Sequence, residues 1–173
     1  MAKKTHYLLD ANVLMEAKRR YYRFGLCPGF WECIAWQYKQ GALSSIDRIK
    51  KEIDEGKDDL TQWAKKSAPK GFFASTTDPA VGAWFGKMVA WAQAEKQYLP
   101  EAKSEFATGT DGWLVAYAKE HELTVVTHET YDEQIKNRVK IPNVCNKFGV
   151  PCIDTFDMLE ALNTKFTWKN TGK

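Results

Sequence analysis

Short apolar runs alternate with longer amphipathic stretches along most of this 173-residue chain. The runs at 7–9, 72–74 and 123–127 predict buried β-strands, and a weaker strand region at 144–145 and 150–153 surrounds Gly149. Helices are predicted between and after them, at 13–22, 30–40, 44–55, 60–68, 79–98, 111–120 and 155–162. Strands separated by helices indicate a mainly parallel sheet covered on both faces. We therefore expect an α/β fold, a three-layer α/β/α domain.

Composition fits one folded domain over residues 1–173. Hydrophobic residues make up 44% of the chain, which excludes an intrinsically disordered protein. Four cysteines without a CxxC pair or a histidine at zinc-like spacing indicate reduced thiols. Residues 1–9 do not have the pattern of a signal peptide, and no apolar run approaches membrane-spanning length. The expected location is the cytoplasm, without a membrane partner.

An acid follows each of the two clearest strands. Asp10 comes directly after the run at 7–9, and Glu129 follows the run at 123–127. The carboxyl ends of parallel strands share one edge of a sheet, and ligands bind at that edge in open α/β folds. We expect these two carboxylates on the same rim. Each also has an ordinary alternative, because Asp10 fits a helix cap and Glu129 fits a solvated loop acid.

Two further acids fit the same rim. Asp111 opens a predicted helix, where it would cap the backbone N–H groups, bind a ligand, or do both. In the helix at 44–55, Glu52 lies roughly 90° from the centre of the isoleucine stripe and Asp54 roughly 105°. We choose Glu52 over Asp54. We read Asp47 as half of a capping box with Ser44.

Four such carboxylates repel one another unless a cation is present. Oxygen ligands without histidine or cysteine suit Mg²⁺ or Mn²⁺, and these ions promote attack of water on phosphodiesters. The predicted catalytic and metal-ligating residues are Asp10, Glu52, Asp111 and Glu129.

Four short motifs resemble those of the PIN domain, the nuclease fold of VapC-type bacterial toxins. They are LLDANVL at 8–14, SSIDRIKKEI at 44–53, TDGWLVAYA at 110–118 and VVTHE at 125–129. The strings EAKRRYY at 16–22 and KIPNVC at 140–145 more closely resemble a less characterised PIN-like toxin family. The chain departs from a minimal PIN domain in its larger segments at 24–40 and from residue 79. It also carries glutamate at position 129, where many members have aspartate.

The resemblance implies a Mg²⁺- or Mn²⁺-dependent endonuclease that is the toxin of a type II toxin–antitoxin system. RNA is the favoured substrate, and nicking of DNA is the alternative. A cognate antitoxin is the implied protein partner, and a homodimer is expected. Asn12 and Thr127 are candidates for supporting the acids or contacting substrate, and Asn12 fits a helix cap equally well.

Basic residues gather in two places although the net charge is only +3. In the first cluster, Arg19 and Arg20 adjoin Tyr21 and Tyr22, an arrangement that suits contact with bases and phosphates. A solvated face or an interface with a protein partner explains the same pattern. The second cluster comprises Lys136, Arg138, Lys140 and Lys147.

Two other functions compete with the nuclease. A PIN-like module without activity would bind RNA or a protein partner, although the four acids argue against it. A phosphatase would use Asp10 as a covalent nucleophile, but such an enzyme calls for a second aspartate where Asn12 stands.

Overall fold

A five-stranded parallel sheet forms the centre of the computed structural model, which describes residues 5–169. The strands are β1 (Tyr7–Leu9), β2 (Leu43–Ile46), β3 (Phe73–Ala74), β4 (Thr124–Val126) and β5 (Cys152–Ile153). Their spatial order is β3-β2-β1-β4-β5, and every neighbouring pair is parallel. The predicted α/β class and parallel sheet are confirmed, and the strand order is that of a PIN-like topology.

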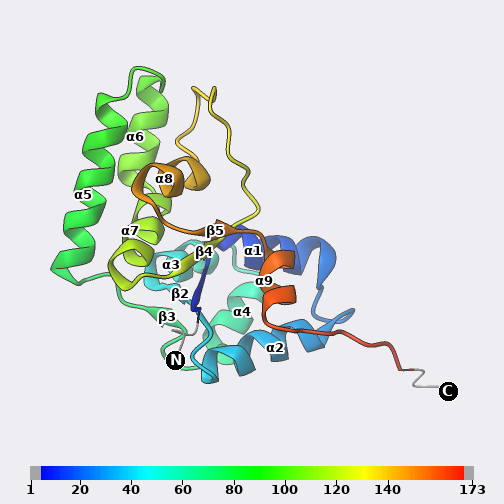
Figure 1. Ribbon diagram of the computed structural model, residues 1–173. Helices are drawn as coiled ribbons and strands as arrows, with labels where there is room; N and C mark the ends of the chain where they lie inside the picture. The colour runs from blue at the N-terminus through cyan, green and yellow to red at the C-terminus, as the bar shows by residue number, and fades with distance from the viewer. Residues whose placement is uncertain (1–4, 170–173) are drawn as a thin grey trace.

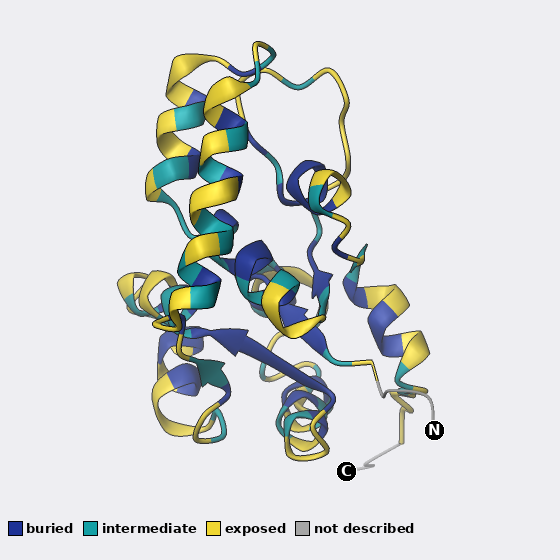
Figure 2. Ribbon diagram, turned by 60° about the vertical axis from the view of Figure 1, so that its left-hand side comes forward, coloured by how far each residue is buried: buried dark blue, intermediate teal, exposed yellow. Residues whose placement is uncertain are grey.

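Helices cover both faces of the sheet (Figure 1). The chain forms α1 (Ala11–Glu16), the π-helical turn η1 (Ala17–Tyr21), α2 (Pro28–Lys39), α3 (Asp47–Glu55), α4 (Asp59–Lys66), α5 (Pro79–Ala94), α6 (Pro100–Thr108), α7 (Asp111–His121), α8 (Ile141–Phe148) and α9 (Thr155–Ala161). In Figures 1 and 2, α5, α6 and α7 lie on one side, while α2 and α4 lie on the other. This division follows from right-handed crossovers that run from β1 toward β3 and then back to β4.

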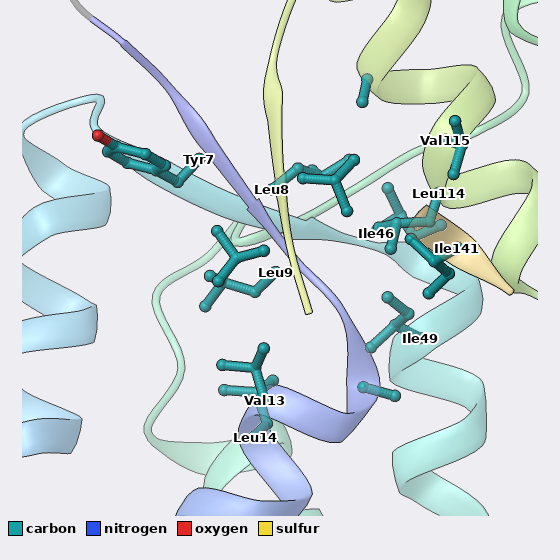
Figure 3. Close-up of a cluster of buried hydrophobic side chains, with 14 of the residues drawn as sticks. Tyr7, Leu8, Leu9, Val13, Leu14, Ile46, Ile49, Leu114, Val115 and Ile141 are labelled. Carbon is teal, nitrogen blue, oxygen red and sulfur yellow. The ribbon is translucent and has the colours of Figure 1, made fainter. Parts of the chain in front are cut away.

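The core lies against the central strands. Leu8 and Leu9 of β1 are fully buried, as are Val125 and Val126 of the neighbouring β4. Figure 3 shows the β1 side chains in a cluster with those of α1, β2, α3, α7 and α8. Because β1 is covered on both faces, its three residues are all apolar, and the first polar side chain is Asp10 at its carboxyl end.

The predicted start of the helix at 44–55 is wrong, because 43–46 form β2 and α3 begins at Asp47. Two serines in this segment resemble a helix cap, yet both are buried in the sheet. The Ser45 hydroxyl donates to the Leu9 carbonyl at 2.8 Å, and Ser44 shares a hydrogen bond of 2.8 Å with His6. The expected capping box does not form. Asp47 instead accepts hydrogen bonds from the backbone and side chain of Thr76.

The expected strand at 144–145 is also wrong, because these residues lie in α8. Ile141, Val144 and Cys145 are buried at helical spacing, and Gly149 ends the helix with φ of +64°. The strand region at 150–153 is reduced to β5. The long helix from Pro79 ends at Ala94, and 100–108 form the unpredicted α6.

Candidate active site at the sheet edge

Asp10 lies at the carboxyl edge of the sheet, where β1 and β4 are neighbours. The strands to one side of this pair follow β1 in the chain, whereas the strand on the other side follows β4. This is the topological switch point, the place where open α/β sheets bind ligands. Asp10 is only 5% exposed, and its Oδ1 accepts a hydrogen bond of 2.7 Å from the Ala11 N–H at the start of α1. The helix-cap alternative for Asp10 is therefore realised, and it leaves Oδ2 for other contacts.

Thr127 connects the ends of the two strands. Its hydroxyl donates to Asp10 Oδ2 at 2.9 Å and accepts from Asn12 Nδ2 at 3.1 Å and from the Glu129 N–H at 3.2 Å. Asn12 Oδ1 accepts from the His128 N–H at 3.1 Å. Asn12 thus bridges to the segment after β4, and Asp10 is the cap of α1. The network fixes the orientation of the Asp10 carboxylate from two sides.

Asp111 is the first residue of α7, and Thr110 occupies the cap position. Burial raises the pKa of Asp111, and the charge of Glu129 raises it further, while Arg138 opposes both effects. Asp10 is more strongly affected: burial raises its pKa well above the ordinary value, and the charges of Asp111 and Glu129 add to this. The hydrogen bond from Thr127 opposes the rise. Asp10, Asp111 and Glu129 therefore form one electrostatic group.

Glu129 is not a solvated loop acid, because its side chain is only 9% exposed. Its Oε2 accepts a hydrogen bond of 2.8 Å from the Ile141 N–H at the start of α8. Its Oε1 lies 2.8 Å from Arg138 Nη2. Both oxygens therefore have protein partners, so this carboxylate can bind a cation only if it gives up or shares a contact.

Arg138 is the residue at this site that the sequence did not assign. Its Nη2 also lies 3.4 Å from Asp111 Oδ2, so that one guanidinium faces two of the predicted acids. The residue stands in the irregular segment between β4 and α8, where no periodic pattern indicates the direction of a side chain. In the sequence, Arg138 stands out only as a member of a basic cluster. Such a cluster does not show whether an arginine is solvated or pairs with the acids of a site.

Glu52 faces the same site from α3. It lines a cleft of about 380 Å³ together with Lys51, Glu105, Asp111 and Arg138. Burial and the charge of Asp111 raise the pKa of Glu52. Asp54, the alternative on this helix, pairs instead with Lys50 at 2.7 Å.

The chemistry of this donor set fits a hard divalent cation. The carboxyl groups of Asp10, Glu52 and Asp111 all have raised pKa values, and neighbouring acids contribute to each rise. A divalent cation would relieve this repulsion, and carboxylate oxygens are the ligands that Mg²⁺ and Mn²⁺ prefer. Within residues 5–169, however, no group of three or more His, Cys, Asp or Glu side chains is already arranged to hold a metal ion. The residue types therefore suit such an ion, but their side chains are not already arranged around one position.

The basic and aromatic residues at 18–22 have separate environments. Lys18 lies 2.7 Å from Asp58 and 3.1 Å from Asp59, and Arg20 lies 2.9 Å from Glu16. The Tyr22 ring stacks on Phe30 at a centroid distance of 4.3 Å, whereas Tyr21 is 50% exposed. Tyr22 thus contributes to packing, and Tyr21 faces the surface near the acids.

The sheet order and the acids at its carboxyl edge define a three-layer α/β domain of PIN-like topology. A family model described as Domain of unknown function (DUF4411) matches residues 7–166, and the chain belongs to this family. A search of curated proteins finds no match. Among the residues that the structure describes, no helix is both long enough and apolar enough to cross a membrane.

Proposed function

We propose that this protein is a metal-dependent endonuclease that hydrolyses phosphodiester bonds of RNA and acts as the toxin of a toxin–antitoxin pair. The observation that carries the proposal is that acids from four elements influence one another electrostatically near the carboxyl edge of the sheet: Asp111 and Glu129 act on Asp10, and Asp111 acts on Glu52. Asp10 follows β1, Asp111 opens α7, Glu129 follows β4 and Glu52 lies on α3. Burial and, next to it, neighbouring acids raise the pKa values of Asp10 and Asp111, and carboxyls perturbed in this way are typical of functional sites.

Asp10 and Asp111 would hold the cation, with Glu52 on the cleft side, and an Asp10 oxygen would use its second lone pair while it keeps its hydrogen bond. Bound there, Mg²⁺ or Mn²⁺ would neutralise a phosphate oxygen and supply a water of lowered pKa. Thr127 keeps Asp10 in one orientation through its 2.9 Å hydrogen bond. Arg138, half-exposed beside Asp111, is placed to bind a non-bridging phosphate oxygen when substrate enters the cleft.

The phosphatase alternative is less well supported by this arrangement. Both Asp10 oxygens accept hydrogen bonds from the protein, and the residue is almost completely buried. A carboxylate that attacks phosphorus needs one oxygen free to approach the substrate. Asn12, where such an enzyme would need a second acid, bonds to Thr127 and to the His128 backbone.

One observation favours a second candidate, a PIN-like binding module without activity. Arg138 already supplies a positive charge to Asp111 and Glu129. A site whose acids are neutralised from within has less need of a metal ion. Such a module would bind RNA or a protein partner through the same rim and would cleave nothing.

Cleavage by purified protein separates these candidates. With Mg²⁺ or Mn²⁺, the protein is expected to cut single-stranded RNA, with DNA as a parallel substrate. Asp10→Asn and Asp111→Asn are expected to lower the rate at least about 100-fold, because each removes a charge that would hold the cation. Asp54→Asn is the matched control, since its carboxylate pairs with Lys50 on the same helix as Glu52. No cleavage of RNA or DNA, or equal cleavage by Asp10→Asn, would contradict the proposal.

The toxin role has its own test. Expression of the wild-type chain in bacterial cells is expected to stop growth, and Asp10→Ala at the same protein level is expected to permit it. Mapping the ends of cleaved RNA in the two cultures identifies the substrate. Growth arrest of equal strength with both chains would show that toxicity does not come from this site.

A further inference from the structure

Three aromatic side chains meet at the surface beside Asp10 and Thr127. Tyr21 ends η1, His128 follows β4, and Phe156 lies in the first turn of α9. Their ring centroids are 5.6 Å apart for Tyr21 and Phe156, 6.0 Å for His128 and Phe156, and 6.5 Å for Tyr21 and His128. Tyr21 is 50% exposed and Phe156 is 42% exposed. We call these three residues the aromatic cluster.

The aromatic cluster is rigidly joined to the acids. The His128 backbone N–H donates to Asn12, and its ring shares a hydrogen bond of 3.0 Å with the buried Thr155 hydroxyl. Thr127, which binds Asp10, precedes His128 directly, and Glu129 follows it. The aromatic cluster is therefore connected to Asp10 and Glu129 through directly neighbouring residues of the segment after β4.

The π-helical turn η1 determines where Tyr21 points. The Tyr22 N–H donates to the Ala17 carbonyl at 2.7 Å, an i to i+5 hydrogen bond. Tyr21 is the last residue of η1, and the chain leaves helical geometry at Tyr22, whose φ is -131° and ψ is 48°. Tyr22 stacks on Phe30, and Tyr21 faces His128 and Phe156. Single π turns of this kind occur frequently at functional sites.

Charges of both signs border the aromatic cluster, with Asp154 and Asp157 beside Phe156 on α9 and arginines on the side of Tyr21. Arg19, Arg20 and Arg23 are exposed on the segment that carries Tyr21. Exposed rings bordered by arginines are the usual surface for single-stranded nucleic acid, because bases stack on the rings while the cations neutralise phosphates. A base inside a duplex has neighbours on both faces, so this surface favours unpaired bases over duplex.

We propose that the aromatic cluster is a site that binds an unpaired nucleobase next to the bond that is cut. This inference rests on the proposed function for its position relative to the cut, but the binding itself needs no catalysis. Stacking uses the π-face that all four bases share, so the preference is for strandedness rather than for one base.

Fluorescence anisotropy with a labelled 12-nucleotide single-stranded RNA tests the proposal in EDTA, where metal-dependent cleavage cannot contribute. A blunt RNA duplex of the same length is the comparison. The wild-type chain is expected to prefer the single strand. The double variant Tyr21→Ala/Phe156→Ala is expected to weaken binding of the single strand about tenfold and to leave duplex binding unchanged.

Two variants control for folding and for general aromatic surface. Tyr21→Phe retains the ring and is expected to bind like the wild type. Trp36→Ala removes an exposed aromatic on α2 that lines a separate cavity, and it is expected to have no effect. A single-stranded RNA carrying 5-iodouridine, irradiated with the wild-type chain, is expected to cross-link to peptides that contain Tyr21, His128 or Phe156.

Equal binding of single strand and duplex, no binding of either, or no change in the double variant would overturn the proposal. The last result, together with cross-links elsewhere, would assign the aromatic cluster to a protein partner. Failure of the nuclease proposal has a different signature, namely retained single-strand binding without cleavage when Mg²⁺ or Mn²⁺ is added.

Discussion

Arg138 Nη2 lies 2.8 Å from Glu129 Oε1 and 3.4 Å from Asp111 Oδ2, so one cation of the chain faces two acids of the candidate site. A guanidinium in this place neutralises charge that a divalent ion would otherwise neutralise. A divalent ion bound as proposed would compete with Arg138 for the same carboxylates.

Replacing Arg138 with Met is expected to lower the free energy of unfolding in EDTA by about 1 kcal/mol, because Asp111 and Glu129 lose their partner in a half-exposed position. The same change is expected to tighten Mg²⁺ or Mn²⁺ binding severalfold. Urea denaturation and calorimetric titration measure the two effects. Arg20→Met breaks an ion pair with Glu16 outside the site and should not alter metal affinity. Unchanged metal affinity in Arg138→Met would show that the cations do not compete.

Asp10→Asn is expected to stabilise the metal-free protein at neutral pH. The pKa of Asp10 is raised in the folded state, chiefly by burial, so the folded protein binds more protons than the unfolded chain. The free energy of unfolding therefore falls as pH rises from about 4, the ordinary value, through the raised pKa. Asparagine carries no charge, so the free energy of unfolding of Asp10→Asn should exceed that of the wild type by about 0.5–2 kcal/mol at pH 7. Urea denaturation between pH 4 and pH 8 should show a flatter profile for the variant. Identical profiles would contradict the raised pKa of Asp10 in the folded protein.

Divalent ions are expected to reverse this order of stability. At 100 times the dissociation constant, Mg²⁺ or Mn²⁺ would raise the free energy of unfolding of the wild type by about 2.7 kcal/mol. Asp10→Asn should gain much less, because it lacks a proposed ligand, while Asp54→Asn should respond like the wild type. Thermal melting with and without each ion provides the measurement. An equal shift in all three proteins would place the bound ion elsewhere.

Thr127→Val is expected to lower the free energy of unfolding by about 1–3 kcal/mol. The change removes a buried hydroxyl that serves Asp10, Asn12 and the Glu129 backbone, and it leaves their groups without a partner. Any cleavage rate should fall as well, since Asp10 loses its orientation. Thr127→Ser keeps the hydroxyl and should recover most of both losses. If Thr127→Ser recovered the stability but not the cleavage rate, the hydroxyl would stabilise the fold without being sufficient to orient Asp10 for cleavage.

Gly112→Ala is expected to destabilise the protein by about 1–3 kcal/mol and to disturb the neighbouring Asp111. A Cβ at this position would lie 2.8 Å from the Phe85 ring and 3.0 Å from Phe106, where α5 and α6 pack against α7. Gly86 on α5 has open space, so Gly86→Ala is the matched control and should be neutral or slightly stabilising. Thermal melting compares the two. Equal melting temperatures would show that α7 shifts without cost.

Where strong apolar runs end in an acid, the sequence was sufficient to predict the structure. The runs before Asp10 and before Glu129 form parallel strands of one sheet, as predicted, and the structure adds that these strands are neighbours, with Leu8 opposite Val125. Asp78, directly before the proline that opens α5, caps that helix, with its Oδ1 accepting from the Ala80 N–H. These features depend on local pattern and burial, which a single chain displays directly.

Where polar residues are buried through distant partners, local pattern gave the wrong structure. Ser44 and Ser45 look like a helix start, but their hydroxyls find partners in His6 and Leu9 of the neighbouring strand segment. Arg138 could not be placed either, because its position depends on how an irregular segment returns to α8. Tyr21 and Tyr22 are adjacent in sequence but have different environments, because η1 ends between them. No local pattern in the sequence indicates this end.

Because β1 pairs with β4, the site can form only late in the synthesis of the chain. Asp10 and Thr127 meet only when two strands more than 100 residues apart in the chain are side by side. A ribosome that has made the first 110 residues holds a chain with Asp10 and Glu52 but without the residues that orient and complete the acid group. For a protein proposed to cut RNA, late assembly would keep the nascent chain harmless to the message and the ribosome that produce it.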